Sequence, residues 1–209
     1  MAIKDGISLI IDYLFNVSDA YRTYQTEKKD ILNTYRDRAL SDELANAEAK
    51  VKKDIESAVR GIQSTADSLL MATHNGNSYD ASSDAVFNAA QLLSVKGVSR
   101  EAVKSVVSQF VGNQVALNLI HASADPEYYD MIEPWMFDSI GTLERIKNIA
   151  GALQYESIEN YPSLVSQIRE AVQSYGVHQG IEFGVLNDRI EALRMQNVIN
   201  LMGLDPSIL

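Results

Sequence analysis

The chain has 209 residues, of which 46% are hydrophobic, with no cysteine and a net charge of −10 at neutral pH. The hydrophobic fraction is too high for a disordered chain, and the absence of cysteine excludes disulfides and thiolate metal sites. The negative charge argues against direct binding to nucleic acids or acidic membrane surfaces, because both are negatively charged themselves.

Two apolar segments raise the question of a membrane or secretory signal. The first fifteen residues are apolar, but Asp5 and Asp12 interrupt them and no cleavage signal follows, so we expect an amphipathic helix. Residues 105–124 carry no formal charge, yet they include serine, asparagine, glutamine and histidine, which indicates a buried helix rather than a membrane span. We therefore expect no membrane contact and a cytoplasmic protein, or a virion protein if a phage encodes it.

Apolar residues in the first 72 positions recur three and four residues apart, which is typical of amphipathic helices. One stripe covers residues 7–35 and a second covers residues 44–69. The segment 39–44 between them predicts a turn, in which Ser41 or Asp42 caps the second helix. This pattern predicts a long helical hairpin, and the alternative is one uninterrupted helix through Ser41.

An Asn-Gly turn signal near residue 75 marks the predicted boundary between two domains. These are an N-terminal, coiled-coil-like helical hairpin (residues 1–73) and a helical bundle (residues 80–209). Ser99 is expected to cap the second helix of the bundle. The predicted fold class is all-α, a long N-terminal helical hairpin plus a C-terminal helical bundle, whose helices we expect at about 81–95, 99–123, 135–154, 161–175 and 181–202.

The first helix is rich in tyrosine. A tyrosine combines an apolar ring with a polar hydroxyl, which suits protein interfaces that are partly wet. The alternative is that these side chains pack inside the hairpin with their hydroxyls at its rim. Because two helices alone cannot bury both sides of the stripe, we favour the interface and take four tyrosines as candidate interaction residues: Tyr13, Tyr21, Tyr24 and Tyr35.

No residue pattern predicts a catalytic, cofactor-binding or metal-binding site. The three histidines lack the spacing of metal ligands, and the acidic residues of segment 125–138 lack the spacing of a calcium loop. We therefore expect no cofactor and no enzymatic activity. A helical enzyme whose site is assembled only in three dimensions, for example from His121, Asp125 and Glu144, is kept as an alternative.

One stretch resembles a known group of proteins. Residues 24–45, YQTEKKDILNTYRDRALSDELA, lead into residues 47–55, AEAKVKKDI. They are similar to helical hairpins of small phage and prophage proteins, which pair two charged helices across a short Leu-Ser-Asp turn. The resemblance covers about residues 20–60 and implies a role in virion structure, assembly or host interaction, without catalysis.

We therefore expect a non-enzymatic helical assembly or interaction protein, such as a phage or prophage structural or scaffolding component. Its expected partner is a protein, either another copy in a homo-oligomer or a different chain. One alternative is an acidic inhibitor that occupies a nucleic-acid-binding site on another protein. That alternative is motivated by residues 61–209, which carry 8 basic and 17 acidic side chains.

Overall fold

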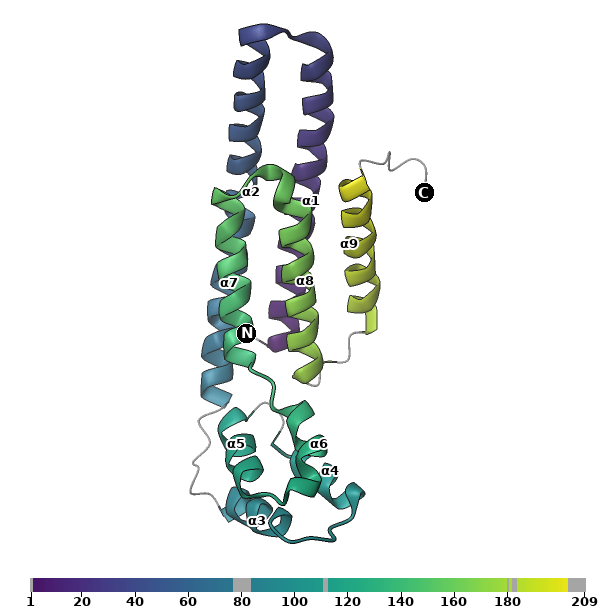
Figure 1. Cartoon of the computed structure of the whole chain (residues 1–209). Coiled ribbons are helices and arrows are strands. Elements are labelled where there is room, and N and C mark those ends of the chain that lie inside the picture. Colours follow the sequence, from purple (N-terminus) through teal and green to yellow (C-terminus); the bar gives the residue numbers. More distant parts are fainter. Residues whose placement is uncertain (1, 77–83, 111–112, 180, 182–183, 203–209) are drawn as a thin grey trace.

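The computed structural model describes residues 2–76, 84–110, 113–179, 181 and 184–202, and every regular element in these ranges is helical (Figure 1). The predicted all-α fold class is confirmed. Two long helices, α1 (Ile3–Thr34) and α2 (Asp37–Gly76), form the N-terminal hairpin. In the described part of the chain, no helix is both long enough and apolar enough to cross a membrane.

The turn of the hairpin lies at Tyr35 and Arg36, so the prediction of a turn at residues 39–44 was wrong. The Arg36 Nη1 donates hydrogen bonds to the carbonyl oxygens of Leu32 (2.9 Å) and Tyr35 (2.6 Å). An arginine at this position satisfies carbonyl groups that the end of a helix leaves free. The turn therefore depends on an arginine side chain and not on the predicted serine or aspartate cap.

Asp37 begins α2 with a φ of 53°, in the left-handed region. Aspartate enters this region more readily than most residues, because its short side chain hydrogen-bonds locally. Ser41 and Asp42 consequently lie inside α2 rather than at its start. The Leu-Ser-Asp sequence is helical, and the hairpin reverses one turn earlier.

Three later helices pack on this hairpin: α7 (Ser139–Tyr155), α8 (Tyr161–His178) and α9 (Gly184–Met202). Helix α7 lies against α2, and α8 lies against α1 and α7, so these four helices form one bundle (Figure 1). Helix α9 packs on α1 and α8. The bundle has a single core whose fully buried side chains include Ile7, Ile10, Leu14, Ile62, Leu69, Leu143, Ile146, Leu153 and Ile168.

The remaining helices form a smaller unit at one end of the bundle (Figure 1). Its core contains Val103, Leu117, Ile120 and Ile132, and does not share buried residues with the bundle core. The elements of this unit are α3 (Asp84–Leu93), α4 (Arg100–Ser108), α5 (Gln114–Ser123), η1 (Pro126–Tyr128), α6 (Tyr129–Ile132) and η2 (Glu133–Trp135).

The prediction of one helix over residues 99–123 was wrong, because α4 and α5 are separate. The side chain of Asn113 accepts a hydrogen bond from the Ala116 amide at 3.0 Å and so begins a new helix. Asparagine competes for backbone groups in this way when it interrupts an apolar helix. The predicted cap at Ser99 is confirmed, since its Oγ accepts from the Ala102 amide at 3.3 Å.

The two cores group the helices differently from the predicted division into residues 1–73 and 80–209. The bundle core combines side chains of both segments, such as Leu69 and Leu143, while the smaller core uses residues 86–132. The hairpin is thus largely covered by its own chain. The cause is that α7 and α8 return to the hairpin and complete its apolar stripe, a long-range contact that local periodicity does not reveal.

Candidate interaction site at the hairpin tip

The structure separates the four candidate tyrosines. Tyr21 and Tyr24 are buried in the bundle core, with 5% and 3% of their surfaces exposed. Tyr13 is partly buried against the same core, whereas 38% of Tyr35 is exposed. Tyr21 and Tyr24 therefore occupy the alternative position inside the hairpin, and Tyr35 is the candidate that presents the most accessible ring.

Tyr13 explains an unexpected glycine in the middle of α2. A Cβ atom placed on Gly61 would lie 2.3 Å from Cζ of the Tyr13 ring. Glycine is unfavourable inside a helix, but here its missing side chain allows the ring to lie directly on the backbone of α2. The tyrosine thus fixes how closely α1 and α2 approach.

Tyr24 and Tyr161 are buried near the connection between α7 and α8. Burial, together with the neighbouring Glu48 and Glu159, raises the pKa of Tyr24 to about 12. Burial also raises the pKa of Tyr161 to about 12, with a second contribution from Glu48. The Tyr161 hydroxyl has no hydrogen-bond partner among the described residues. These tyrosines therefore serve packing in this chain and stay protonated at neutral pH.

Contacts of Glu159 mark the level at which α7 and α8 stop covering the hairpin. Glu159 lies in η3 (Ile158–Asn160), which connects these two helices. Its Oε1 is 2.5 Å from Lys28 Nζ, and its Oε2 accepts from Gln25 Nε2 at 3.2 Å. Beyond this level α1 and α2 continue without α7 and α8 (Figure 1). We call residues 29–47 the hairpin tip.

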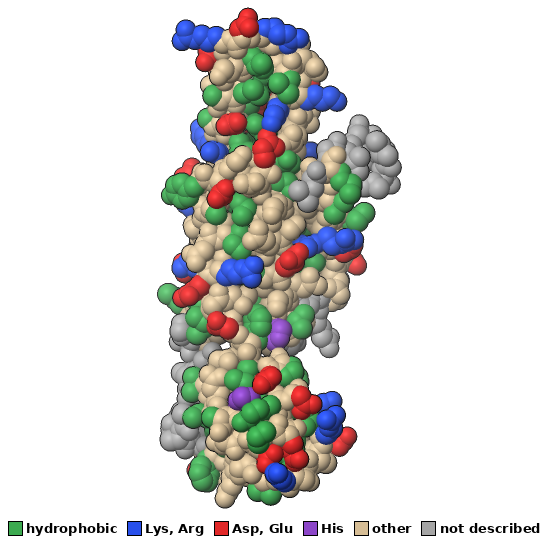
Figure 2. All heavy atoms as spheres, in the orientation of Figure 1, with side chains coloured by type: hydrophobic (Ala, Val, Ile, Leu, Met, Phe, Trp, Pro, Cys, Tyr) green, Lys and Arg blue, Asp and Glu red, His purple; other side chains and the backbone are tan. Residues whose placement is uncertain are grey.

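The hairpin tip has apolar side chains that its own two helices do not fully cover. Ile31 is buried, but 47% of Leu32 and 38% of Tyr35 are exposed, and Leu40 and Leu44 are only partly buried. Figure 2 shows apolar side chains between the two helices at this end, with charged side chains along the edges. A helix pair leaves such a surface because each helix has one apolar stripe and only one neighbour.

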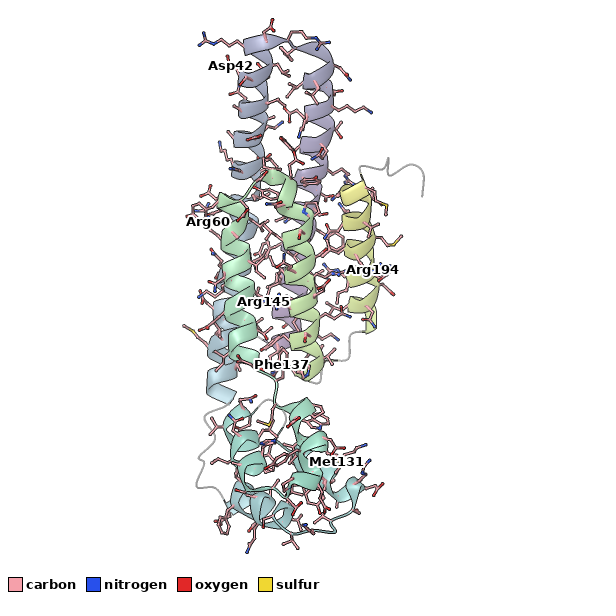
Figure 3. All side chains as sticks on the ribbon, in the orientation of Figure 1. Asp42, Arg60, Met131, Phe137, Arg145 and Arg194 are labelled. Carbon is pink, nitrogen blue, oxygen red and sulfur yellow. The ribbon has the colours of Figure 1, made fainter. Side chains whose placement is uncertain are left out.

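Charge is divided between the two helices of the tip. Residues 29–36, the part of the tip that contains the end of α1, hold two basic side chains and one acidic, a net of +1. Residues 37–47, at the start of α2, hold one basic and three acidic side chains, a net of −2. Asp42 is one of these acids and lies close to the end of the hairpin (Figure 3). The tip therefore presents a basic helix beside an acidic one.

A groove of about 630 Å³ lies along α1 from Arg22 to Tyr35. Helix α9 runs in the same direction as α1, and near its end Asn200 Nδ2 donates to Ser18 Oγ at 3.0 Å. Just before, Gln196 Nε2 donates to Asp19 Oδ1 at 2.7 Å. The groove thus begins where the described contacts of α9 with α1 end.

The residues considered for a catalytic site are dispersed. His121 stacks on Tyr129, with ring centroids 4.2 Å apart, and its Nε2 is 3.5 Å from Glu133 Oε1. Asp125 instead caps η1 by accepting from the Glu127 amide at 3.1 Å. Glu144 lies on α7 in the bundle, whereas His121 belongs to the smaller unit. The three residues are therefore not joined in one described site.

The acidic segment 125–138 also has local structural roles. The Asp138 side chain accepts from the Gly141 amide at 2.8 Å and caps α7, at the passage between the two cores, where Phe137 is labelled in Figure 3. Glu127 accepts from the Gly97 amide at 3.0 Å. Among the described residues, no three His, Cys, Asp or Glu side chains are grouped so that they could hold a metal ion.

The sequence contained part of the signal for this site. The leucines and the charge asymmetry of residues 28–49 are visible in it, but the return of α7 and α8 decides which part of the hairpin is left uncovered.

Comparisons with known proteins found no matching family model, no matching curated protein and no matching solved structure.

Proposed function

We propose that this protein is a non-enzymatic helical interaction or assembly protein and that the hairpin tip is its binding element. The observation that carries the proposal is the incomplete cover of the tip. Leu32 and Tyr35 are exposed there, whereas below the tip the stripe of the hairpin, for example at Ile7, Leu14 and Ile62, is buried in the bundle core. Apolar side chains gathered on a protruding surface are typical of protein contacts.

The hairpin tip contributes little to the stability of the isolated chain. Between residues 29 and 47 only Ile31 and Ala47 are buried, so the tip buries little apolar surface. Helices draw most of their stability from such burial. A partner that covers Leu32 and Tyr35 would bury the apolar surface that the chain itself leaves exposed. A structural or scaffolding role, as in the phage and prophage proteins that residues 20–60 resemble, is the setting we propose.

Affinity capture with matched surface variants tests this function. The variant L32E/Y35E places two charges on the tip, and Met71→Glu places one on α2 outside the tip, where 69% of Met71 is exposed. Each tagged protein is incubated with an extract of its native cells, and retained proteins are quantified by mass spectrometry. We expect proteins that bind the wild type and M71E but not L32E/Y35E. Equal binding by all three would refute the role of the tip.

A further inference from the structure

We propose that the partner of the hairpin tip is a second copy of this chain, whose tip packs across the first to form a four-helix bundle between the two molecules. This inference rests on the proposed function, since it names the partner of the same surface. Two observations carry it: the continuity of the covered face and the order of charges along the tip.

The face that α7 and α8 cover continues into the tip. Below the level of Glu159, this face of the hairpin is packed against an antiparallel pair of helices, α7 and α8. Above that level α1 and α2 extend further (Figure 1), and apolar side chains are visible between them (Figure 2). A helix pair is therefore the shape that already fits this face, and four helices form a closed apolar core.

The charges of one tip are complementary to those of the tip of a second copy. A two-fold axis would place the end of α1, with a net of +1 over residues 29–36, beside the start of α2 of the other copy, with a net of −2 over residues 37–47. The same axis repeats this pairing, so two attractive contacts form together. The opposite arrangement would place like charges side by side. The order of charges thus selects one arrangement of the two tips.

A partner of uniform charge fits the tip less well. A uniformly acidic surface would be attracted by α1 and repelled by α2, and a basic surface would meet the reverse. A second copy offers both charges in the matching order.

Because the uncovered segments are short, the contact lies at the small end of protein interfaces, and we expect association that depends on concentration and weakens with added salt.

Charge reversal on one helix at a time tests this pairing. K29E/N33E makes residues 29–36 acidic, and D42K/E43K makes residues 37–47 basic, so each variant carries like charges on both helices of its tip. The mass in solution is measured by light scattering after size exclusion. We expect the wild type to approach twice 23.1 kDa as concentration rises. Each variant alone should dimerise more weakly than the wild type, by a factor of about ten or more.

Mixing the two variants gives the decisive result. Their tips are complementary to each other, so an equimolar mixture should dimerise at least as well as the wild type. Arg60→Glu, on an exposed part of α2 outside the tip, is the matched control and should dimerise normally. Circular dichroism and thermal unfolding confirm that each variant folds.

The inference is overturned if the wild type stays at 23.1 kDa at every concentration, or if both variants dimerise like the wild type. Failure of the mixture to dimerise would also contradict the proposed charge order. The capture experiment with L32E/Y35E separates the two proposals. A monomeric wild type with tip-dependent capture refutes only the second copy as partner, whereas a monomer with tip-independent capture refutes the proposed function too.

Discussion

Tyr161 and Tyr175 are both fully buried tyrosines of α8, but their hydroxyls differ in their surroundings. The Tyr175 hydroxyl is 3.0 Å from Thr73 Oγ1, whereas the Tyr161 hydroxyl has no partner among the described residues. A buried polar group without a hydrogen bond destabilises a fold by about 1–3 kcal/mol. The same substitution should therefore have opposite effects at the two positions.

We expect Tyr161→Phe to raise the free energy of unfolding by about 1 kcal/mol, because it removes an unsatisfied hydroxyl. Tyr175→Phe should lower it by a similar amount, because it leaves Thr73 without its partner. Urea denaturation followed by circular dichroism measures both. A loss of stability in Y161F would mean that its hydroxyl makes a hydrogen bond in solution.

Burial of these tyrosines also predicts a loss of stability at high pH. The pKa values of Tyr24 and Tyr161 are raised to about 12, above the value of about 10 in an unfolded chain. The folded state therefore holds these protons more tightly. Its stability is complete below about pH 10 and falls as pH rises from there through about 12. Urea denaturation at a series of alkaline pH values should show this fall, and Y24F/Y161F should reduce its slope.

At the scale of elements, the local signals in the sequence located helices well and their ends less well. Ser99 starts α4 as expected, since its effect involves only the next three residues. The turn at Arg36 and the break before Asn113 were missed, because a polar side chain there redirects a chain whose apolar periodicity continues. The periodicity placed Tyr21 and Tyr24 on the correct apolar stripe. It did not show that other helices of the same chain bury them in the bundle core.

The approach of α1 to α2 is tested by adding one methyl group. Gly61→Ala should lower the free energy of unfolding by about 1–3 kcal/mol, because its Cβ would overlap the Tyr13 ring. The matched control is Gly151→Ala on α7, where the nearest atom is the flexible end of Gln63, 3.3 Å away. That change should be neutral or stabilising by up to about 1 kcal/mol, the helix propensity of alanine over glycine. Equal effects at both sites would contradict the close approach.

At the scale of the whole molecule, the chain forms two hydrophobic cores. In sequence, the segment that forms the smaller core lies between the two segments that form the larger one. The hairpin and the returning helices enclose one, and residues 86–132 enclose the other. The all-α class followed from the sequence. The sharing of the larger core did not, because it depends on which distant stripes meet, and nothing in the spacing of residues 135–202 specifies their partner.

The separation of the cores predicts that they can be destabilised one at a time. Leu117 is fully buried in the smaller core, so Leu117→Ala should destabilise it by about 2–5 kcal/mol. Hydrogen exchange measured by mass spectrometry should then quicken in peptides from residues 84–132. Peptides covering α7 and α8 should be unchanged. A uniform increase across both units would show that they unfold together.

The most direct test of the hairpin tip as the contact between copies is the mass in solution over a range of protein concentrations. We predict that the wild type rises from 23.1 kDa toward twice that value, and that L32E/Y35E, with two charges on the exposed apolar surface, stays at 23.1 kDa. A wild type that keeps a mass of 23.1 kDa throughout, or a variant that rises equally, would contradict the account.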